Sequence, residues 1–225
     1  VMWTTQWAFA IEAWRHGPGR RLPIWLDAVG EFEALLAFAT FAAEHPDYAF
    51  PAFADGQASL VGRDVAHPIL PADAVANDIA LSHDPLQLLV VSGSNMSGKS
   101  TWLRALGVNV ILASAGAPVR ASSFTMTPLS VGAAISVHDS LIDGRSRFFA
   151  EIRRLKQIVD LATERDGRVL FLLDEILGGT NSHDRRAGAA AVLTGLVQRG
   201  AIGLATTHDL ALGDIVGALG PETAA

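Results

Sequence analysis

Residues 88–106 read LLVVSGSNMSGKSTWLRAL, an apolar run followed by a glycine-rich turn and the start of a helix. The turn from Gly93 to Ser100 has the spacing glycine, four residues, glycine-lysine-serine, which is typical of a phosphate-binding loop. The run before it, 88–91, is predicted to be a buried strand. Strand, glycine loop and helix in this order are the surroundings that the motif requires, so a chance glycine-rich turn is the weaker explanation.

The residue types in this turn suit a triphosphate. Gly93 and Gly98 remove side chains that would hold the backbone away from the phosphates, and the N–H groups of 97–101 can point inward at the positive end of a helix. Lys99, one of only two lysines in the chain, supplies a point charge, and Ser100 offers a hydroxyl to Mg²⁺. The predicted nucleotide-binding residues here are Gly93, Ser94, Asn95, Met96, Ser97, Gly98, Lys99, Ser100 and Thr101.

The composition narrows the class of protein. The chain has 225 residues, half of them apolar, which is enough for a buried core and argues against disorder. A net charge of −6 argues against a wide nucleic-acid-binding face, and the absence of cysteine excludes disulfides and cysteine metal sites. Residues 1–14 are too short and too polar to span a bilayer and lack a signal-peptide pattern. We expect a cytoplasmic protein, and a chain that is a piece of something longer because it starts inside a running helix.

Two regions are predicted along the chain. Residues 1–54 are expected to be a helical connector at the end of a preceding domain, with Trp3, Trp7 and Trp14 on one helix face as packing core. The first helix breaks at 17–19 and a second runs from about 24 to 44. Residues 55–225 are expected to form a nucleotide-binding domain that is truncated at its C-terminus.

Helix and strand signals alternate in the second region. We predict strands at 88–91, 169–173 and 201–205, a hairpin or short strands within 119–137, and helices at 99–114, 146–165, 184–199 and 209–219. This order implies an α/β sandwich with a largely parallel sheet, whose strands end at one shared edge.

Three further groups are predicted to gather around the loop. Asp174 and Glu175 end an apolar strand, where Asp174 can hold Mg²⁺ and Glu175 can orient or deprotonate a water that attacks the γ-phosphate. His208 follows the next strand and can donate to that phosphate, although a histidine alone there is more often structural. Ser146 opens a helix and is either an anion ligand or an ordinary N-cap with Glu151 near the first turn; the two are compatible.

Taken together, this order of motifs resembles that of the ATPases of the ABC superfamily, and the local sequences of the motifs resemble those of the MutS family of DNA mismatch repair ATPases. The motifs are GSNMSGKST (93–101), GRSRFFAE (144–151), LDEILGGTNSHD (173–184) and TTHD (206–209), with AHPIL (66–70) and NDI (77–79) before the loop. The resemblance covers about 57–219, and the preceding helices look like the end of the family's lever region.

The resemblance implies an ABC-type P-loop fold, ATP hydrolysis with Mg²⁺, and an ATP-dependent dimer with composite sites. It assigns the phosphates to the glycine loop, Mg²⁺ to Ser100 and Asp174, the water to Glu175 and the γ-phosphate to His208. Ser146 would act in trans on a second copy. By the same resemblance, His67 and Pro68 lie near the adenine, and the inter-subunit loop contains Asn181, Ser182 and Asp184.

The chain also departs from the family's wording. Ser97 and Arg147 stand where glycine and threonine are commonest, and the only Phe-any-Glu pair, Phe149 and Glu151, belongs to the serine helix rather than to a mismatch reader. The wording is similar to shorter bacterial members that lack that reader, and DNA is expected to be reached through domains outside this chain.

Other functions fit fewer of these features. A nucleotide-gated interaction module with little hydrolysis, or an ABC-type ATPase coupled to another process, shares the loop and the carboxylates. A transporter subunit would need a Leu-Ser-Gly-Gly-Gln signature, and a small-molecule kinase would explain neither Ser146 nor His208.

Overall fold

The computed structural model describes residues 2–94, 97–135, 147–178, 180–208 and 223–224. The chain divides into two compact units, Val1–Pro46 and Asp47–Ala225. Residues 47–54 belong to the second unit, where Ala49 bridges Val119 and the strand Ala52–Phe53 pairs with a later strand.

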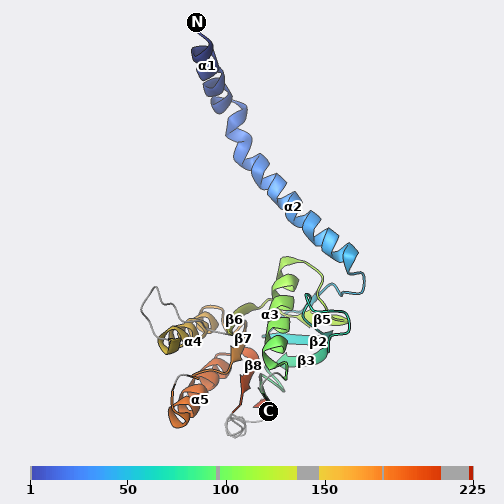
Figure 1. Ribbon diagram of the computed structural model, residues 1–225, viewed down its shortest axis with the longest axis vertical. Coiled ribbons are helices and arrows are strands. Elements are labelled where there is room, and N and C mark those ends of the chain that lie inside the picture. The colour runs from blue at the N-terminus through green and yellow to red at the C-terminus, as the bar shows by residue number, and fades with distance from the viewer. Residues whose placement is uncertain (1, 95–96, 136–146, 179, 209–222, 225) are drawn as a thin grey trace. The chain divides into compact units, whose positions relative to one another are not determined.

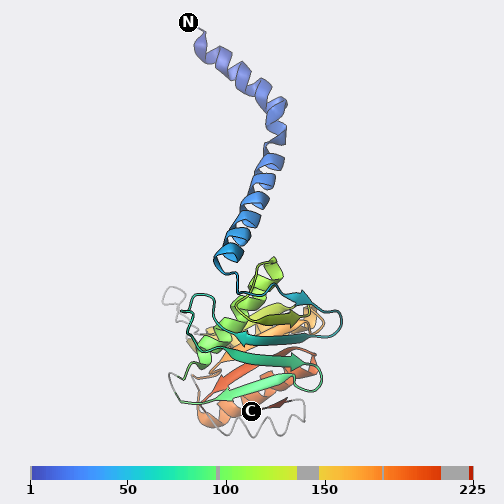
Figure 2. The same ribbon diagram turned by 90° about the vertical axis from the view of Figure 1, so that its right-hand side faces the viewer.

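The first unit consists of helices that follow one another along the chain. They are α1 (Trp3–His16), the 3₁₀ helix η1 (Pro18–Arg21) and α2 (Leu22–Glu44), as the sequence predicts. The expected burial of the tryptophan stripe is not found within this chain: α1 and α2 bury no residue, and Trp3 is 71% exposed. The reason is that α1 and α2 are joined through η1 rather than packed side by side, so neither covers the other's apolar face (Figures 1 and 2).

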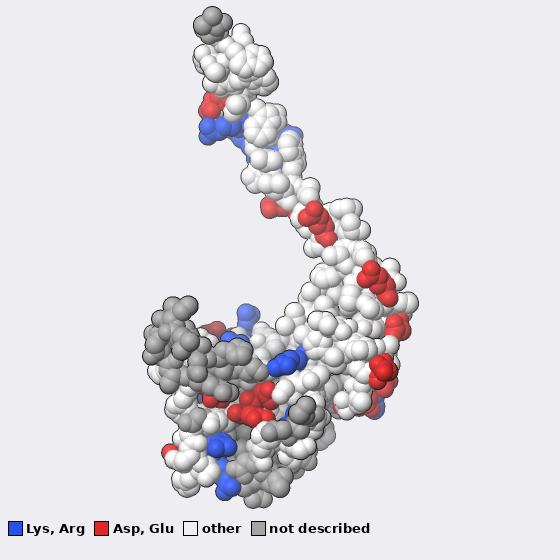
Figure 3. Space-filling model, viewed as in Figure 1, with Lys and Arg blue, Asp and Glu red and all other residues white. Residues whose placement is uncertain are grey.

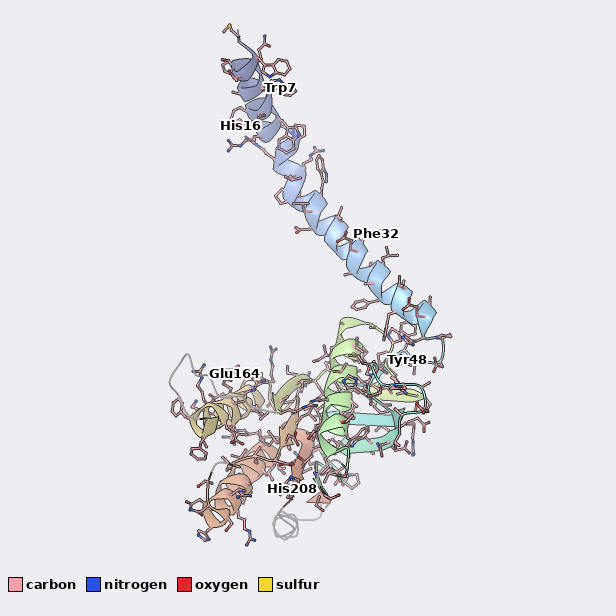
Figure 4. All side chains as sticks on the ribbon, in the orientation of Figure 1. Trp7, His16, Phe32, Tyr48, Glu164 and His208 are labelled. Carbon is pink, nitrogen blue, oxygen red and sulfur yellow. The ribbon has the colours of Figure 1, made fainter. Side chains whose placement is uncertain are left out.

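Charge is distributed unevenly over these helices. The sequence places Arg15, Arg20 and Arg21 around the junction of α1 and η1, whereas α2 carries acidic side chains and no lysine or arginine. Figure 3 shows the acidic groups spread along α2 rather than gathered into a patch. Figure 4 shows the Trp7 and Phe32 side chains standing out from their helices.

The second unit contains two sheets and three described helices. A mixed sheet has the order β1-β5-β2-β3, and a parallel sheet has the order β6-β7-β8-β4-β9. The strands are β1 (Ala52–Phe53), β2 (Ser59–Val65), β3 (Asn77–Ser82), β4 (Leu88–Ser92), β5 (Ser123–Met126), β6 (Ser130–Ala134), β7 (Val169–Asp174), β8 (Ile202–Thr207) and β9 (Thr223–Ala224). The helices are α3 (Lys99–Ala115), α4 (Arg147–Glu164) and α5 (Ser182–Gln198).

The inner strand β7 defines the layers, because its side chains alternate between the two faces of the parallel sheet. Val169, Phe171 and Leu173 pack in the cluster that holds the buried residues of α4 and α5. Leu170 and Leu172 pack in the cluster that holds α3 and the mixed sheet. The parallel sheet therefore lies between an α4/α5 layer and a layer formed by α3 and the mixed sheet (Figure 1).

The α/β arrangement with a parallel sheet confirms the fold class at that level. Of the two alternatives predicted within 119–137, short strands are found rather than a hairpin, because β5 joins the mixed sheet and β6 joins the parallel sheet. The helix predicted at 209–219 lies outside the described residues. Among the residues that are described, no helix is long and apolar enough to cross a membrane.

Candidate active site

Three neighbouring strands bring the predicted site residues to one edge of the parallel sheet. In the strand register Asp174 of β7 lies opposite Thr206 of β8, and Ser92 of β4 lies opposite Thr207. The glycine loop follows Ser92, Glu175 follows Asp174, and His208 follows Thr207. Segments far apart in sequence thus meet where parallel strands end, as the sequence predicts.

The glycine loop encloses the Lys99 ammonium. Lys99 is 7% exposed, and its Nζ donates to the carbonyl oxygens of Gly93 and Ser94, both at 2.8 Å. Gly98 has φ +91°, a left-handed conformation that L side chains rarely adopt, and it allows α3 to begin at Lys99. A Cβ on Gly93 would lie 3.3 Å from Ser97 Oγ, so a side chain there would crowd the inside of the loop. Asn95 and Met96 lie outside the described residues.

The amino end of α3 opens at this loop. No side chain caps it among the described residues, and the first helical bond runs from Trp102 N to Gly98 O at 2.9 Å. The preceding backbone N–H groups, those of Lys99, Ser100 and Thr101, therefore have no carbonyl partner within the helix. This end of α3 carries the positive pole of the helix dipole, which suits an anion.

Thr206 contacts both residues that carry the carboxylates at the end of β7, the side chain of Asp174 and the backbone of Glu175. Thr206, 3% exposed, donates from Oγ1 to Asp174 Oδ1 at 2.6 Å. The backbone N–H of Glu175 donates to Thr206 O at 3.2 Å and also points at Thr206 Oγ1, 3.3 Å away. Glu175 has φ 51°, so the chain turns sharply as it leaves the strand. The motif identified the two carboxylates but not Thr206, although a doubled threonine before His208 marks its position.

His208 bridges the glycine loop and the catalytic candidate Glu175. Its Nε2 lies 2.5 Å from Glu175 Oε1, and its Nδ1 lies 3.3 Å from Gly93 O. Both contacts are to oxygen atoms, and a neutral imidazole donates to one of them, through whichever ring nitrogen carries its proton.

His67 and Pro68 lie in the loop between β2 and β3, where backbone carbonyls are held by buried donors. Arg120, 9% exposed, donates to the carbonyl of His67 at 2.9 Å and to three more, those of Leu70, Pro71 and Ala72. The Tyr48 hydroxyl donates to Pro68 O at 3.4 Å. Burial raises the pKa of that hydroxyl, and the nearby Arg120 charge opposes the shift.

Asn109 links this loop to α3. Its side-chain amide donates to Ala66 O and its oxygen accepts from Arg120 N, both at 2.9 Å. The loop that carries His67 is therefore tied to the helix that begins at Lys99. Sequence reasoning missed Arg120 and Asn109, because a polar residue within an apolar stretch of sequence gives no local indication of a distant partner.

Asp78, within the NDI motif, braces an irregularity in β2. Its carboxylate accepts hydrogen bonds from the backbone N–H of Asp64, at 3.0 Å, and from the Arg63 guanidinium. The backbone of Asp64 has a φ of 52° at this irregularity. The backbone N–H of Asp64 and then Arg63 hold the pKa of Asp78 below its ordinary value.

The remaining predicted residues lie around α4 and α5. Ser146 is outside the described residues. Glu151 Oε1 accepts the backbone N–H of Leu177 at 2.5 Å, and the capping alternative for Ser146 stays a prediction. Asn181 caps α5, accepting from Asp184 N at 2.9 Å.

Comparison with known proteins identifies related sequences. The family model described as MutS domain V matches residues 89–219. Endonuclease MutS2 of Thermus thermophilus is 37% identical over 143 residues, covering 63% of this chain and 18% of the relative. DNA mismatch repair protein MutS of Haloquadratum walsbyi is 35% identical over 204 residues, 88% of this chain and 21% of the relative. DNA mismatch repair protein MSH3 of Candida glabrata is 31% identical over 175 residues, which cover 76% of this chain and 17% of the relative. The chain spans about a fifth of the length of these relatives.

Proposed function

Because this chain belongs to the MutS family, we propose that it is the ATP-binding and ATP-hydrolysing part of a protein of DNA mismatch repair or a related DNA process. One observation carries the proposal. Lys99, the carboxylates of Asp174 and Glu175, and His208 converge on the edge where β4, β7 and β8 end. A cation within a glycine loop beside two carboxylates is an arrangement suited to a triphosphate with a divalent metal.

The residues fit ATP and Mg²⁺ in their donor chemistry. The glycine loop, Lys99 and the free N–H groups of α3 would hold the phosphates, while the Ser100 hydroxyl and the Asp174 carboxylate supply the oxygen ligands that Mg²⁺ prefers. When bound, Mg²⁺ neutralises charge that develops on the phosphate oxygens. His67 and Pro68 are proposed to lie near the adenine.

Hydrolysis is assigned to the pair formed by Glu175 and His208. The Glu175 carboxylate orients a water toward the γ-phosphate and accepts a proton from it. The water oxygen bonds to the γ-phosphorus as the bond from that phosphorus to the β–γ bridging oxygen breaks, and ADP and phosphate leave. His208 contacts Glu175 Oε1 at 2.5 Å, and with ATP bound one of its ring N–H groups is proposed to turn from its present acceptor to the phosphate oxygen that gains charge. The Lys99 ammonium stabilises the same charge. Thr206 keeps Asp174 and Glu175 in place through the bonds described above.

The finer features of the proposal rest on the resemblance. They are an ABC-type P-loop fold, an ATP-dependent dimer in which Ser146 of one copy completes the other copy's site, and a cytoplasmic protein similar to the shorter members without a mismatch reader. Residues 1–54 would be the connector from a preceding domain, and contact with DNA would come through domains outside this chain.

The Glu175→Gln variant tests the proposal. Gln has nearly the same shape but cannot take the proton, so ATP turnover should fall by about 100-fold or more while ATP still binds. Turnover is measured by phosphate release, binding by equilibrium dialysis, and pairing by sedimentation with and without ATP and Mg²⁺. We expect the variant to accumulate as the ATP-bound dimer.

Lys99→Ala is the matched control, because it should lose both nucleotide binding and pairing. Equal turnover in wild type and Glu175→Gln would overturn the catalytic assignment, and pairing of Lys99→Ala on addition of ATP would overturn the composite site. A wild-type chain that pairs with ATP but hydrolyses it negligibly would instead support the nucleotide-gated interaction module.

A further inference from the structure

The turn that follows β7 has an unusual backbone. Glu175 has φ 51° and Leu177 has φ 61°, so two non-glycine residues within three positions adopt the left-handed conformation. Such residues persist only where the surrounding structure holds them, and they gather at functional sites. The contacts that hold this turn therefore control where the Glu175 side chain lies.

Each left-handed residue is held through its backbone N–H. The N–H of Glu175 donates to Thr206 on the neighbouring strand, 3.2 Å from its carbonyl oxygen. The N–H of Leu177 donates to Glu151 Oε1 at 2.5 Å. The Leu177 side chain is buried and packs directly on α5, since a Cβ added to Gly188 would lie 2.6 Å from Leu177 Cδ1. The turn is thus fixed by β8, α4 and α5.

Glu151 stands out among these contacts because it is a carboxylate buried to 7% exposure. It lies on the second turn of α4, a helix that begins at Arg147. Burying a carboxylate is costly unless a polar group compensates it, and the Leu177 N–H is the donor that the structure gives it. The bond joins α4 to a residue two positions beyond Glu175.

We propose that Glu151 is a positioning residue for hydrolysis: its carboxylate fixes the 175–177 turn and so makes the position of the Glu175 carboxylate depend on the position of α4. The inference rests on the proposed function of Glu175. A displacement of the beginning of α4 moves the Glu151 carboxylate away from the Leu177 N–H and releases the turn. A contact that holds α4 in place keeps the Glu175 carboxylate aligned.

Three substitutions in the full chain separate the acceptor from the charge. Glu151→Gln keeps an oxygen at the same reach and removes the charge, Glu151→Asp keeps the charge and shortens the reach, and Glu151→Met removes the acceptor at similar size. Glu164→Met is the matched control, because Glu164 is an exposed carboxylate at the other end of α4 (Figure 4). Each variant is measured for kcat and KM with ATP and for ATP affinity at equilibrium.

We expect kcat to fall on the order of 10- to 100-fold in Glu151→Met and Glu151→Asp, since small displacements of a catalytic group have effects of this size. ATP affinity should change less than about twofold, because Lys99 and the glycine loop are untouched. Glu151→Gln should stay within about threefold of wild type, and Glu164→Met should match wild type. Amide hydrogen exchange of a peptide covering 175–178 should be faster in the Glu151→Met and Glu151→Asp variants than in wild type, and unchanged in Glu151→Gln.

The outcomes separate this inference from the proposed function. If wild type hydrolyses ATP and Glu151→Met and Glu151→Asp keep its kcat, the positioning role is wrong and the proposed function stands. Equal losses in the Glu151→Gln, Glu151→Asp and Glu151→Met variants would also overturn it, because an oxygen at the right reach, which Glu151→Gln keeps, would then not be sufficient. If wild type neither binds nor hydrolyses ATP, the proposed function fails, and the inference fails with it. Should Glu151→Met not fold, the comparison of Gln with Asp decides.

Discussion

At the residue scale, Thr206 shows how one hydroxyl can organise two catalytic candidates. Its single proton goes to Asp174 Oδ1, and its oxygen lies within 3.3 Å of the Glu175 N–H. A buried threonine hydroxyl has one donor and two acceptor positions, so both uses are possible together. The bond to Asp174 leaves that carboxylate with a fixed orientation at the end of β7.

We therefore expect Thr206→Val, which keeps the side-chain shape and removes the hydroxyl, to raise the Mg²⁺ concentration needed for half-maximal ATP turnover about tenfold. A hydrogen bond to a charged group contributes about 1.5–3 kcal/mol, or about 10- to 150-fold in an equilibrium constant, and tenfold is the lower end of this range. A Mg²⁺ titration of turnover measures the effect, with ATP binding in EDTA expected to be unchanged. Thr206→Ser keeps the hydroxyl and should behave like wild type; a serine variant as impaired as valine would contradict this role.

At the element scale, the sequence predicts the strands and helices whose pattern is local. The glycine loop lies between β4 and α3, the carboxylates end β7, and the break at Gly17 separates α1 from η1. The sequence pattern does not indicate that β5 and β6 belong to different sheets. Two short apolar runs separated by a turn have the same pattern whether they form a hairpin or join two sheets.

The contacts that support the site were not predictable for a related reason. Glu151 meets Leu177 26 positions away, and Arg120 meets Leu70 50 positions away. Hydrogen bonds of this kind depend on how the layers pack, and a single sequence carries no periodic signal for them. Motif spacing therefore identified the groups proposed to act on ATP, whereas the residues that hold them became visible only in the structure.

The close approach of β8 to β7 yields a prediction on stability. A Cβ on Gly203 would lie 2.1 Å from the backbone oxygen of Phe171, which cannot move without breaking the pairing of the two strands. We expect Gly203→Ala to lower the free energy of unfolding by about 3 kcal/mol, at the upper end of overpacking effects. Urea unfolding followed by circular dichroism measures it.

Gly195→Ala is the matched control, since its Cβ would meet only the flexible end of Arg199, at 3.3 Å. Within α5 the alanine should be neutral or stabilising by up to about 1 kcal/mol. If the two alanine variants lost similar stability, the tight contact between β7 and β8 would not be the cause.

At the scale of the whole molecule, the two units differ in what they can do alone. Both hydrophobic clusters and every candidate site residue belong to Asp47–Ala225. The helices α1 and α2 bury no residue, and the first unit holds four of the five tryptophans. The fifth, Trp102, lies half-buried in the first turn of α3, three positions after Lys99.

A chain that begins at Asp47 should therefore fold and bind ATP with an affinity within about twofold of the full chain, because the phosphate-binding groups and the core that holds them are retained. It contains Trp102 as its single tryptophan, so ATP binding should change the tryptophan emission, a signal that four exposed tryptophans dilute in the full chain. A fluorescence titration with ATP, with equilibrium dialysis as the reference, measures both. Trp102→Phe in the shortened chain should abolish the signal and keep the affinity. If the full chain bound ATP and the shortened chain folded but did not, residues 1–46 would have to contribute to the site.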